Sequence, residues 1–342
     1  MHPPRKATSF DIAQLAGVSQ PTVSRALRGH ASISEETRKR IEAIAHQLNY
    51  KVDKNASSLR SQRSNTLALL FFEDPTPDGS HINPFFLSMV GSITRACARR
   101  GFDLLISFQQ FSQDWHTEYE DSRKADGIIL LGYGDYEQTR SKLELLVSQG
   151  THFVLWGSSK DGQPGVTVGC DNRQGGEDAT VHLMAGGRRR IAFIGTATRH
   201  YPEFFSRWRG YADAHEAAGR AIDPALHREA LNFEEDGYGA AQTLLSAGAG
   251  FDAIMCASDT IALGAMRALQ EAGRRIPQDV AVVGFDDIPT ARVSSPPLSS
   301  VVQDQRLAGD VLVDTLVRQI EGGKASDTVL PVRLVVRQSS EG

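Results

Sequence analysis

Apolar side chains recur at helical spacing in three short stretches of the first fifty residues, and small or polar residues separate these stretches. The first stretch begins after Thr8, whose residue type caps helices, and Gly17 supplies the turn that follows it. Its apolar positions are Ile12, Ala13, Leu15 and Ala16. The pattern predicts a first short helix whose apolar face is covered by two further helices.

The second stretch begins after Ser19 and carries Pro21 in its first turn, where the missing N–H of proline is tolerated. Helical spacing turns Val23, Ala26 and Leu27 toward the first helix. The side chains left outward are Gln20, Thr22, Ser24 and Arg25. A third helix is expected after the capping residue Ser34, with an apolar stripe of Ile41, Ile44, Ala45 and Leu48. The three helices predict one very small all-α core.

From residue 66 onward the pattern changes to near-continuous apolar runs that alternate with amphipathic segments. The seven runs are LALLFF at 67–72, FDLLISF at 102–108, GIILL at 127–131, THFVLWG at 151–157, IAFIG at 191–195, AIMC at 253–256 and VAVVGF at 280–285. Such runs predict parallel strands covered by helices on both faces, in two doubly wound lobes. Ligands of that architecture bind beyond the carboxyl ends of the strands. The polar residues at those ends are Glu73, Asp74, Gln109, Gln110, Trp156, Ser258, Asp259, Asp286 and Asp287.

Composition narrows the class of protein. The chain has 342 residues, more than one hydrophobic core usually spans, so two or three domains are expected. Its 40% hydrophobic and 23% charged residues are typical of a soluble globular protein, which argues against disorder. No run of about eighteen apolar residues and no signal-peptide core occurs, so we expect a cytoplasmic protein without membrane contact.

Charge is distributed unevenly along the chain. Residues 1–64 hold eleven Lys and Arg against five acidic residues, so this segment carries +6 and the remainder −10 of the net −4. A basic head on an acidic body indicates a polyanionic partner for the head alone, although a solvated charged face would give the same count. Cys97, Cys170 and Cys256 are widely spaced and odd in number, which favours buried free thiols over disulfides or zinc.

Residues 8–27, which read TSFDIAQLAGVSQPTVSRAL, carry a family resemblance. They resemble the N-terminal helix-turn-helix of the LacI/GalR repressors, whose pattern is close to T-x-x-D-(I/V)-A-x-x-A-G-V-S-x-x-T-V-S-R. The likeness continues through LNY at 48–50, NPFF at 83–86, ADGIIL at 125–130 and DDIPTARVSSPPLSSVVQD at 286–304. It therefore covers essentially the whole chain in order.

The resemblance implies a particular division of the chain. A helix-turn-helix headpiece would occupy residues 1–50, a hinge helix 51–65, and a periplasmic-binding-protein-like effector and dimerisation core 66–342. The core would consist of an N-lobe at about 66–167 and 299–329 and a C-lobe at about 168–298 and 330–342. We therefore expect an all-α DNA-binding domain followed by a two-lobed α/β domain.

A recognition helix reads DNA with the outward side chains of its N-terminal end. Gln20 can present a bidentate amide to adenine, and Arg25 can reach guanine or a phosphate. Pro21 stands where relatives carry a side chain that hydrogen-bonds a base, and proline offers only apolar contact, so base preference is expected to depend on Gln20 and Arg25. A three-helix module that docks another protein is the alternative. The candidate DNA-binding residues are Thr8, Ser19, Gln20, Pro21, Thr22, Ser24, Arg25, Asn55, Ala56 and Leu59.

Residues 51–65 are polar and basic, and a helix this short is marginal alone in water. The resemblance implies a hinge helix that forms when two subunits sit on DNA, with Leu59 as a wedge in the minor groove and Ala56 packed near it. Val52 and Asn55 depart from the residues frequent in that segment. Alternatively, Leu59 packs against the body of the protein.

The resemblance also places an effector site between the lobes. Arg207 matches the family arginine that clamps hydroxyls or a carboxylate, and Asp286 matches the acid that accepts from ligand hydroxyls. Asp and Arg together with the faces of Trp156, Phe85 and Phe233 suit a neutral sugar. The candidate effector-binding residues are Asp74, Asn83, Phe85, Trp156, Asp171, Arg207, Phe233, Asp259 and Asp286.

These candidates also have plainer interpretations. Arg207 can be an ordinary ion-pair partner, Phe85 and Phe233 can belong to the core, and Asp259 is of a type that caps helices or sits in turns. A purine ligand would stack on the same aromatic rings.

Taken together, the sequence predicts a homodimeric transcription regulator without cofactor. It would repress carbohydrate-utilisation genes and leave a pseudopalindromic operator when a mono- or disaccharide binds. A nucleobase-responsive repressor with the ligand as corepressor is the alternative, and a binding protein without DNA function is disfavoured by the basic head. An enzyme acting on sugars is disfavoured because no G-x-S-x-G, Walker or H-E-x-x-H motif occurs, so no catalytic or metal-binding residue is expected.

Overall fold

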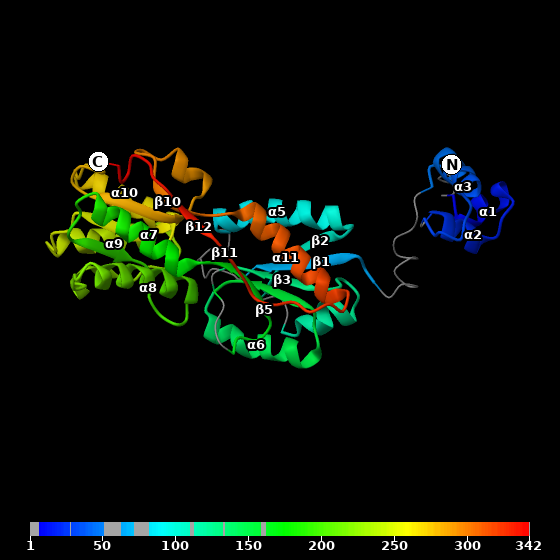
Figure 1. Cartoon of the computed structure of the whole chain (residues 1–342), viewed down its shortest axis with the longest axis horizontal. Helices are drawn as coiled ribbons and strands as arrows, with labels where there is room; N and C mark the ends of the chain where they lie inside the picture. Colours follow the sequence, from blue (N-terminus) through cyan, green and yellow to red (C-terminus); the bar gives the residue numbers. More distant parts are fainter. Residues whose placement is uncertain are drawn as a thin grey trace, which may run out of the picture. The chain divides into compact units, whose positions relative to one another are not determined.

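The computed structural model describes residues 7–27, 29–50, 63–71, 82–109, 113–132, 134–158 and 162–341. The chain divides into two compact units, Met1–Ser64 and Asn65–Gly342 (Figure 1). Among the described helices, none combines the length and the apolar character that a membrane crossing requires.

The first unit contains the three predicted helices, α1 (Ser9–Ala16), α2 (Gln20–Leu27) and α3 (Glu35–Gln47). Thr8 and Asp11 form a reciprocal cap at the start of α1, and Gly17 ends this helix with a left-handed φ of 64°. At the start of α3, the Ser34 hydroxyl accepts the Thr37 N–H. Their core consists of Ile12, Ala13, Ala16, Val23, Ala26, Ile41 and Ala45. The predicted small all-α core is therefore confirmed.

Leu15 does not join this core. Its side chain is 62% exposed, so the expectation that it belongs to the apolar face of α1 is wrong. The reason is the helical turn of about 100° per residue, which places Leu15 beside the face formed by Ile12 and Ala16 rather than on it.

The second unit contains two six-stranded sheets with helices outside them. The first sheet is entirely parallel, in the order β11-β5-β4-β3-β1-β2. Its strands are β1 (Thr66–Phe71), β2 (Asp103–Phe108), β3 (Ile128–Leu131), β4 (Phe153–Trp156), β5 (Val166–Cys170) and β11 (Thr328–Leu330). Helices α5 (Pro84–Arg100) and α11 (Gln305–Ile320) cover one face, and α6 (Tyr136–Gln149) covers the other (Figure 1). A π-helical turn, η2 (His116–Asp121), precedes β3.

The second sheet has the order β12-β10-β9-β8-β6-β7 and is parallel except for β12, which runs antiparallel to β10. Its strands are β6 (Ile191–Ile194), β7 (His227–Arg228), β8 (Ala253–Cys256), β9 (Ala281–Asp286), β10 (Ser299–Gln303) and β12 (Val332–Val335). The associated helices are α7 (Asn172–Ala185), α8 (Pro202–Ala217), α9 (Glu234–Ser246) and α10 (Asp259–Glu271), with short 3-10 turns η3 (Pro224–Leu226) and η4 (Pro289–Arg292). The predicted two doubly wound lobes are confirmed.

The chain crosses between the sheets three times, after Cys170, after Gln303 and after Leu330. The lobe boundaries were predicted at about 167/168, 298/299 and 329/330, so the first two crossings lie a few residues later than predicted and the third lies one residue later. The whole of β5 belongs to the first sheet, and β10 belongs to the second because Ser299 to Val302 pair in register with β9.

Two helix pairs of the C-lobe cross without side chains between their backbones. A β-carbon added to Gly176 of α7 would lie 2.1 Å from the Arg207 carbonyl oxygen of α8, and one on Gly210 of α8 would lie 1.9 Å from the Arg173 carbonyl oxygen of α7. Gly237 and Gly264 stand in the same relation between α9 and α10. The position of α8, which carries Arg207, therefore depends on glycine at its crossing with α7.

Candidate functional site

The outward face of α2 is arranged as predicted. Val23 and Ala26 are buried in the core, whereas Pro21 and Arg25 are exposed. The Ser19 and Thr22 hydroxyls are 2.8 Å apart, and Ser19 also accepts the Thr22 N–H at 3.4 Å. These short polar side chains line the start of the helix.

The side chains of Gln20 and Thr8, which the sequence predicted to contact DNA, both form hydrogen bonds within the headpiece. The amide Nε2 of Gln20 donates to the Ser9 hydroxyl of α1 at 3.2 Å. The Thr8 hydroxyl donates to the Asp11 carboxylate at 2.7 Å, so this side chain is part of the helix cap. Of the other predicted site residues, Asn55, Ala56, Leu59 and Asp74 lie outside the described residues.

Arg207 of α8 carries a fully buried guanidinium in the C-lobe. Its Nε donates to the Asn172 Oδ1 at 2.8 Å, its Nη1 donates to the Ala257 carbonyl oxygen, and its Nη2 lies 3.4 Å from the Asp286 Oδ1. The guanidinium carbon is 3.7 Å from the centre of the Phe285 ring. A buried charge requires such compensation, and these contacts hold the guanidinium in one position.

Asp286 ends β9 and is 1% exposed. Its φ of 110° lies in a region that residues other than glycine rarely adopt. Its Oδ1 accepts from the Gln303 Nε2 at 2.6 Å, across the strand pair β9 and β10. The structure thus brings together the two charged residues that the sequence had placed in the effector site.

Asp259 holds the loop after β9. Its Oδ2 accepts the Ile288 N–H at 2.8 Å, and its Oδ1 accepts from the Ser300 hydroxyl at 2.7 Å. Burial, and then the charge of Asp286, raises the pKa of Asp259 well above its ordinary value. These contacts with the turn after β9 favour the plainer, structural interpretation of Asp259 over a contact with the ligand.

Asn232 was missed by the sequence interpretation. It is 7% exposed, and its Oδ1 accepts from the Ser258 hydroxyl at 2.6 Å, next to the Ala257 carbonyl that binds Arg207. Its Nδ2 is buried and has no hydrogen-bond partner among the described residues. The only sequence signal was a lone polar residue before α9. Gln303 was missed too, because β10 was not recognised as a strand.

The N-lobe contributes Asn83, Phe85 and Trp156. The Asn83 Oδ1 accepts the Phe85 N–H at 2.8 Å at the start of α5, and its Nδ2 is buried without a partner in the described part of the chain. The rings of Phe85 and Trp156, which are 0% and 4% exposed, lie 6.0 Å apart. Phe85 therefore packs as a core residue with Trp156.

Direct contacts join the two lobes near Arg207. The Glu203 carboxylate, one turn before Arg207 on α8, accepts the Ser158 N–H at 2.9 Å just after β4. A second contact joins His200 to Asp135 at 3.0 Å. Burial raises the pKa of Asp135, but the hydrogen bond from His200 and the N–H groups of the α6 terminus outweigh it and leave this pKa below its ordinary value. The carboxyl ends of both sheets therefore meet at this place.

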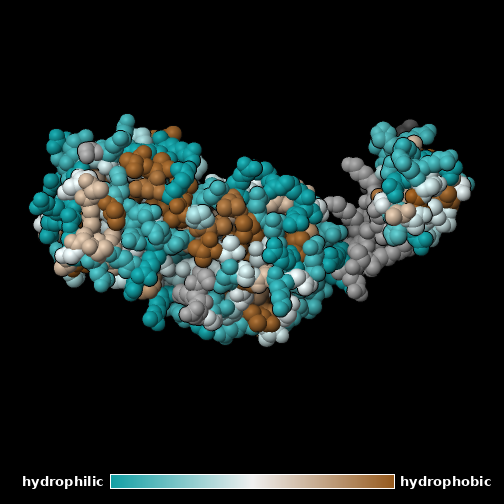
Figure 2. Space-filling view, viewed as in Figure 1, coloured by the Kyte–Doolittle hydropathy of each residue, from teal (hydrophilic) through white to brown (hydrophobic). Residues whose placement is uncertain are grey.

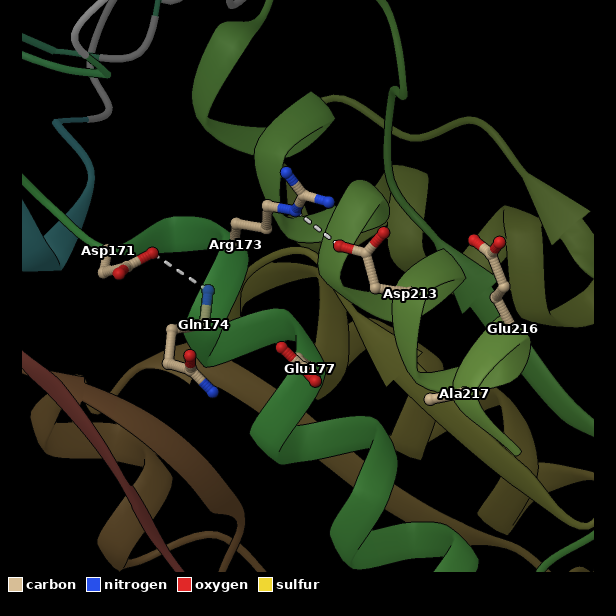
Figure 3. A pocket seen from close by; sticks show the side chains of 7 residues that line it. All are labelled: Asp171, Arg173, Gln174, Glu177, Asp213, Glu216 and Ala217. Atoms are coloured by element: carbon tan, nitrogen blue, oxygen red, sulfur yellow. Dashed lines mark hydrogen bonds and ion pairs between the residues drawn. The ribbon is translucent and has the colours of Figure 1, made fainter. Parts of the chain in front are cut away.

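Asp171 and Phe233, the two remaining effector-site candidates, lie at the starts of helices α7 and α9. Asp171 is exposed and accepts the Gln174 N–H at 3.0 Å at the start of α7. It lies at a surface pocket between α7 and α8, where Arg173 pairs with Asp213 (Figure 3). Phe233 is partly buried and precedes α9. Neither residue is brought into contact with Arg207 or Asp286 by the described hydrogen bonds.

The remaining chemistry of the described residues is limited. Cys97, Cys170 and Cys256 are buried free thiols, as expected, and burial raises the pKa of Cys97 to about 11. In the part of the chain that the structure describes, no group of His, Cys, Asp or Glu side chains is arranged to hold a metal ion.

Comparison with known proteins gives consistent matches. Residues 10–53 match the family model "Bacterial regulatory proteins, lacI family", and residues 180–340 match "Periplasmic binding protein-like domain". The ribose operon repressor of Haemophilus influenzae is 31% identical over 97% of this chain and 98% of its own length. A structure of the transcriptional regulator CelR in complex with cellobiose is 31% identical, with a TM-score of 0.72 over 97% of this chain and 99% of that one. The lac repressor dimer bound to operator and the anti-inducer ONPF is 25% identical, with a TM-score of 0.81 over 99% of this chain and 100% of that one.

Proposed function

The chain belongs to the lacI family of bacterial regulatory proteins and is a DNA-binding transcription regulator, and from this premise we propose its effector and its mode of action. We propose that it represses carbohydrate-utilisation genes in the cytoplasm and leaves its operator when a mono- or disaccharide binds between the two lobes. It would act by binding alone, without catalysis or cofactor.

The observation that carries this proposal is a pair of buried amide donors on opposite lobes. Asn83 Nδ2 in the N-lobe and Asn232 Nδ2 in the C-lobe have no partner among the described residues. A buried polar group without a partner costs about 1–3 kcal/mol, which a bound ligand with acceptor oxygens would remove. The hydroxyl groups of a sugar can accept from both amides and donate to Asp286, and Arg207 would donate to the same hydroxyls.

The names of the relatives support the same chemical class. One is a repressor of a ribose operon, and another was solved with cellobiose. A flat purine would need an open slot between aromatic rings, whereas the rings of Phe85 and Trp156 are buried against each other. A nucleobase corepressor is therefore the less favoured candidate.

A ligand screen tests this proposal. The full chain is heated with each member of a panel of pentoses, hexoses, disaccharides and nucleobases, and every stabilising compound is added to an operator gel shift. A sugar at 100 times its Kd should stabilise the protein by about 2.7 kcal/mol and lower operator affinity. Asn232→Ala should lose most of this stabilisation, whereas Gln174→Ala, at the surface pocket, should keep it. A nucleobase that raises operator affinity while no sugar acts would overturn the proposal.

We also propose that the chain works as a homodimer, because a helix-turn-helix reads paired half-sites. Leu87 of α5 and Leu105 and Ile106 of the edge strand β2 are 52%, 38% and 47% exposed, so this side of the N-lobe offers apolar surface. Figure 2 shows hydrophobic groups gathered at several places on the visible face of residues 65–342. A second copy of the chain would cover such surface.

Light scattering of two aspartate variants tests the interface. Ile106→Asp on β2 should yield monomers, whereas Val147→Asp on α6, which is 52% exposed on the other side of the sheet, should remain dimeric. A dimeric Ile106→Asp protein would exclude β2 from the interface.

A further inference from the structure

The first residues of α1 and α2 are joined through their side chains. Ser9 begins α1 and Gln20 begins α2, and the Gln20 Nε2 donates to the Ser9 hydroxyl at 3.2 Å. Both side chains are only partly buried, and the neighbouring Pro21 is exposed. The hydrogen bond therefore lies at the outward edge of the unit that reads DNA.

The amide of Gln20 keeps its reading capacity in this arrangement. A glutamine amide has two N–H donors and one carbonyl acceptor, and Ser9 occupies one donor. Recognition of adenine needs one N–H for the base N7 and the carbonyl for the N6 amino group. The second N–H and the Oε1 remain for these two contacts, and the hydrogen bond to Ser9 fixes the plane in which they lie.

The neighbouring residues make this orientation important. Pro21 has no side-chain donor or acceptor, so Gln20 is the amide-bearing residue at the N-terminal end of α2. A free glutamine must give up the freedom of three side-chain torsions to read a base. The Thr8 hydroxyl is engaged with Asp11, which leaves the neighbouring Ser9 hydroxyl to hold Gln20.

We propose that Ser9 is a positioning residue for base recognition: its hydroxyl orients the Gln20 amide, so that sequence preference depends on α1 as well as on α2. This inference rests on the DNA-reading role of α2.

The test is a double-mutant cycle with the full chain. The probe is the duplex that the wild-type protein enriches from a randomised palindromic library, with an unrelated duplex of equal length for non-specific binding. The variants are Ser9→Ala, Gln20→Ala, both together, and Ser9→Thr, which keeps the hydroxyl. Ser32→Ala, in the exposed loop before α3, is the matched control. Thermal unfolding shows whether the headpiece remains intact.

We expect Ser9→Ala to lower the preference for the enriched duplex by about 2- to 10-fold and to leave non-specific affinity and unfolding unchanged. In the Gln20→Ala background the same change should have no further effect, and Ser9→Thr should behave like wild type. Fold-changes that multiply in the double variant, or an equal loss on both duplexes, would overturn the positioning role. A wild-type protein that enriches no sequence would instead overturn the DNA-reading role on which the inference rests.

Discussion

The crossing of α7 and α8 gives the most direct test of how the C-lobe holds Arg207. In Gly210→Ala the new β-carbon would lie 1.9 Å from the Arg173 carbonyl oxygen and 2.6 Å from the Glu177 nitrogen. Real β-carbons essentially never approach closer than 3.0 Å, so α8 must move away from α7 by about 1.1 Å. Both obstacles are backbone atoms of a helix and cannot rotate aside.

The magnitude follows from two opposing effects. Overpacking of this kind costs about 3 kcal/mol when the backbone must shift, and alanine in place of a helical glycine returns about 1 kcal/mol. The net loss of about 2 kcal/mol corresponds to a decrease in Tm of about 4–8 °C for a unit of this size. Because Gly176 of α7 lies against the Arg207 carbonyl, the shift should also displace Arg207 and weaken sugar binding.

Gly239→Ala in α9 is the matched control, because a β-carbon there meets nothing within 4 Å. This variant should gain about 0.5–1 kcal/mol from helix propensity alone. Thermal unfolding of both variants, and calorimetric titration with the sugar found by the screen, give the comparison. If Gly210→Ala were as stable as Gly239→Ala, the argument from close backbone contact would be refuted.

Two further predictions concern titration and lobe contacts. Burial lowers the pKa of His215, so the folded protein favours the neutral imidazole. In the unfolded chain the pKa of a histidine is about 6.5, so the stabilising contribution of neutral His215 is fully present above this pH. Stability should therefore fall as the pH drops below about 6.5, by at most about 1.4 kcal/mol per pH unit for this group, and urea unfolding of His215→Gln should show a flatter dependence. The exposed His200–Asp135 contact between the lobes should be worth at most about 1 kcal/mol, so His200→Ala should weaken sugar binding by no more than about 5-fold and leave unfolding nearly unchanged. A larger loss in calorimetry would mean that His200 contacts the ligand.

The helices of the headpiece were predictable because their signals are local. Thr8, Gly17 and Ser34 fix the ends of helices through their own side chains or backbone conformation, without help from distant residues. Leu15 was predicted wrongly because an eight-residue helix shows too few apolar positions to distinguish two adjacent faces. Only the packing of α2 and α3 decides which face is covered.

The strands show the same division between local and tertiary information. All seven predicted apolar runs contain strands, but β5, β7, β10, β11 and β12 were not predicted. Of these, β10 was missed because it begins with two serines. Ser299 and Ser300 are fully buried, and their hydroxyls bond the Arg337 carbonyl and the Asp259 carboxylate. A buried polar strand has no hydropathy signal, and this is why the crossing at Gln303 and the contact of Gln303 with Asp286 were not foreseen.

The proposed switch depends on how α8 is held. Glu203 and Arg207 lie one turn apart on α8, so the contact with Ser158 of the N-lobe and the buried guanidinium move as one body. Helix α8 is fixed to α7, and α7 begins at the first crossing between the lobes, where Asp171 accepts the Gln174 N–H. The hinge and the candidate site are thus parts of the same pair of helices.

This arrangement limits which ligands can act as effectors. Moving a two-state population from 1:99 to 99:1 requires a preference of about 10⁴-fold for one state, whereas a single exposed contact between lobes contributes about 5-fold at most. The ligand itself must therefore contact both lobes, which Asn83 in one and Arg207 with Asn232 in the other would allow. Asn83→Ala should then bind sugar more weakly and also lose much of the sugar's effect on the operator, whereas a change at an independent surface would alter neither. Release of operator with wild-type efficiency by saturating sugar in Asn83→Ala would contradict this argument.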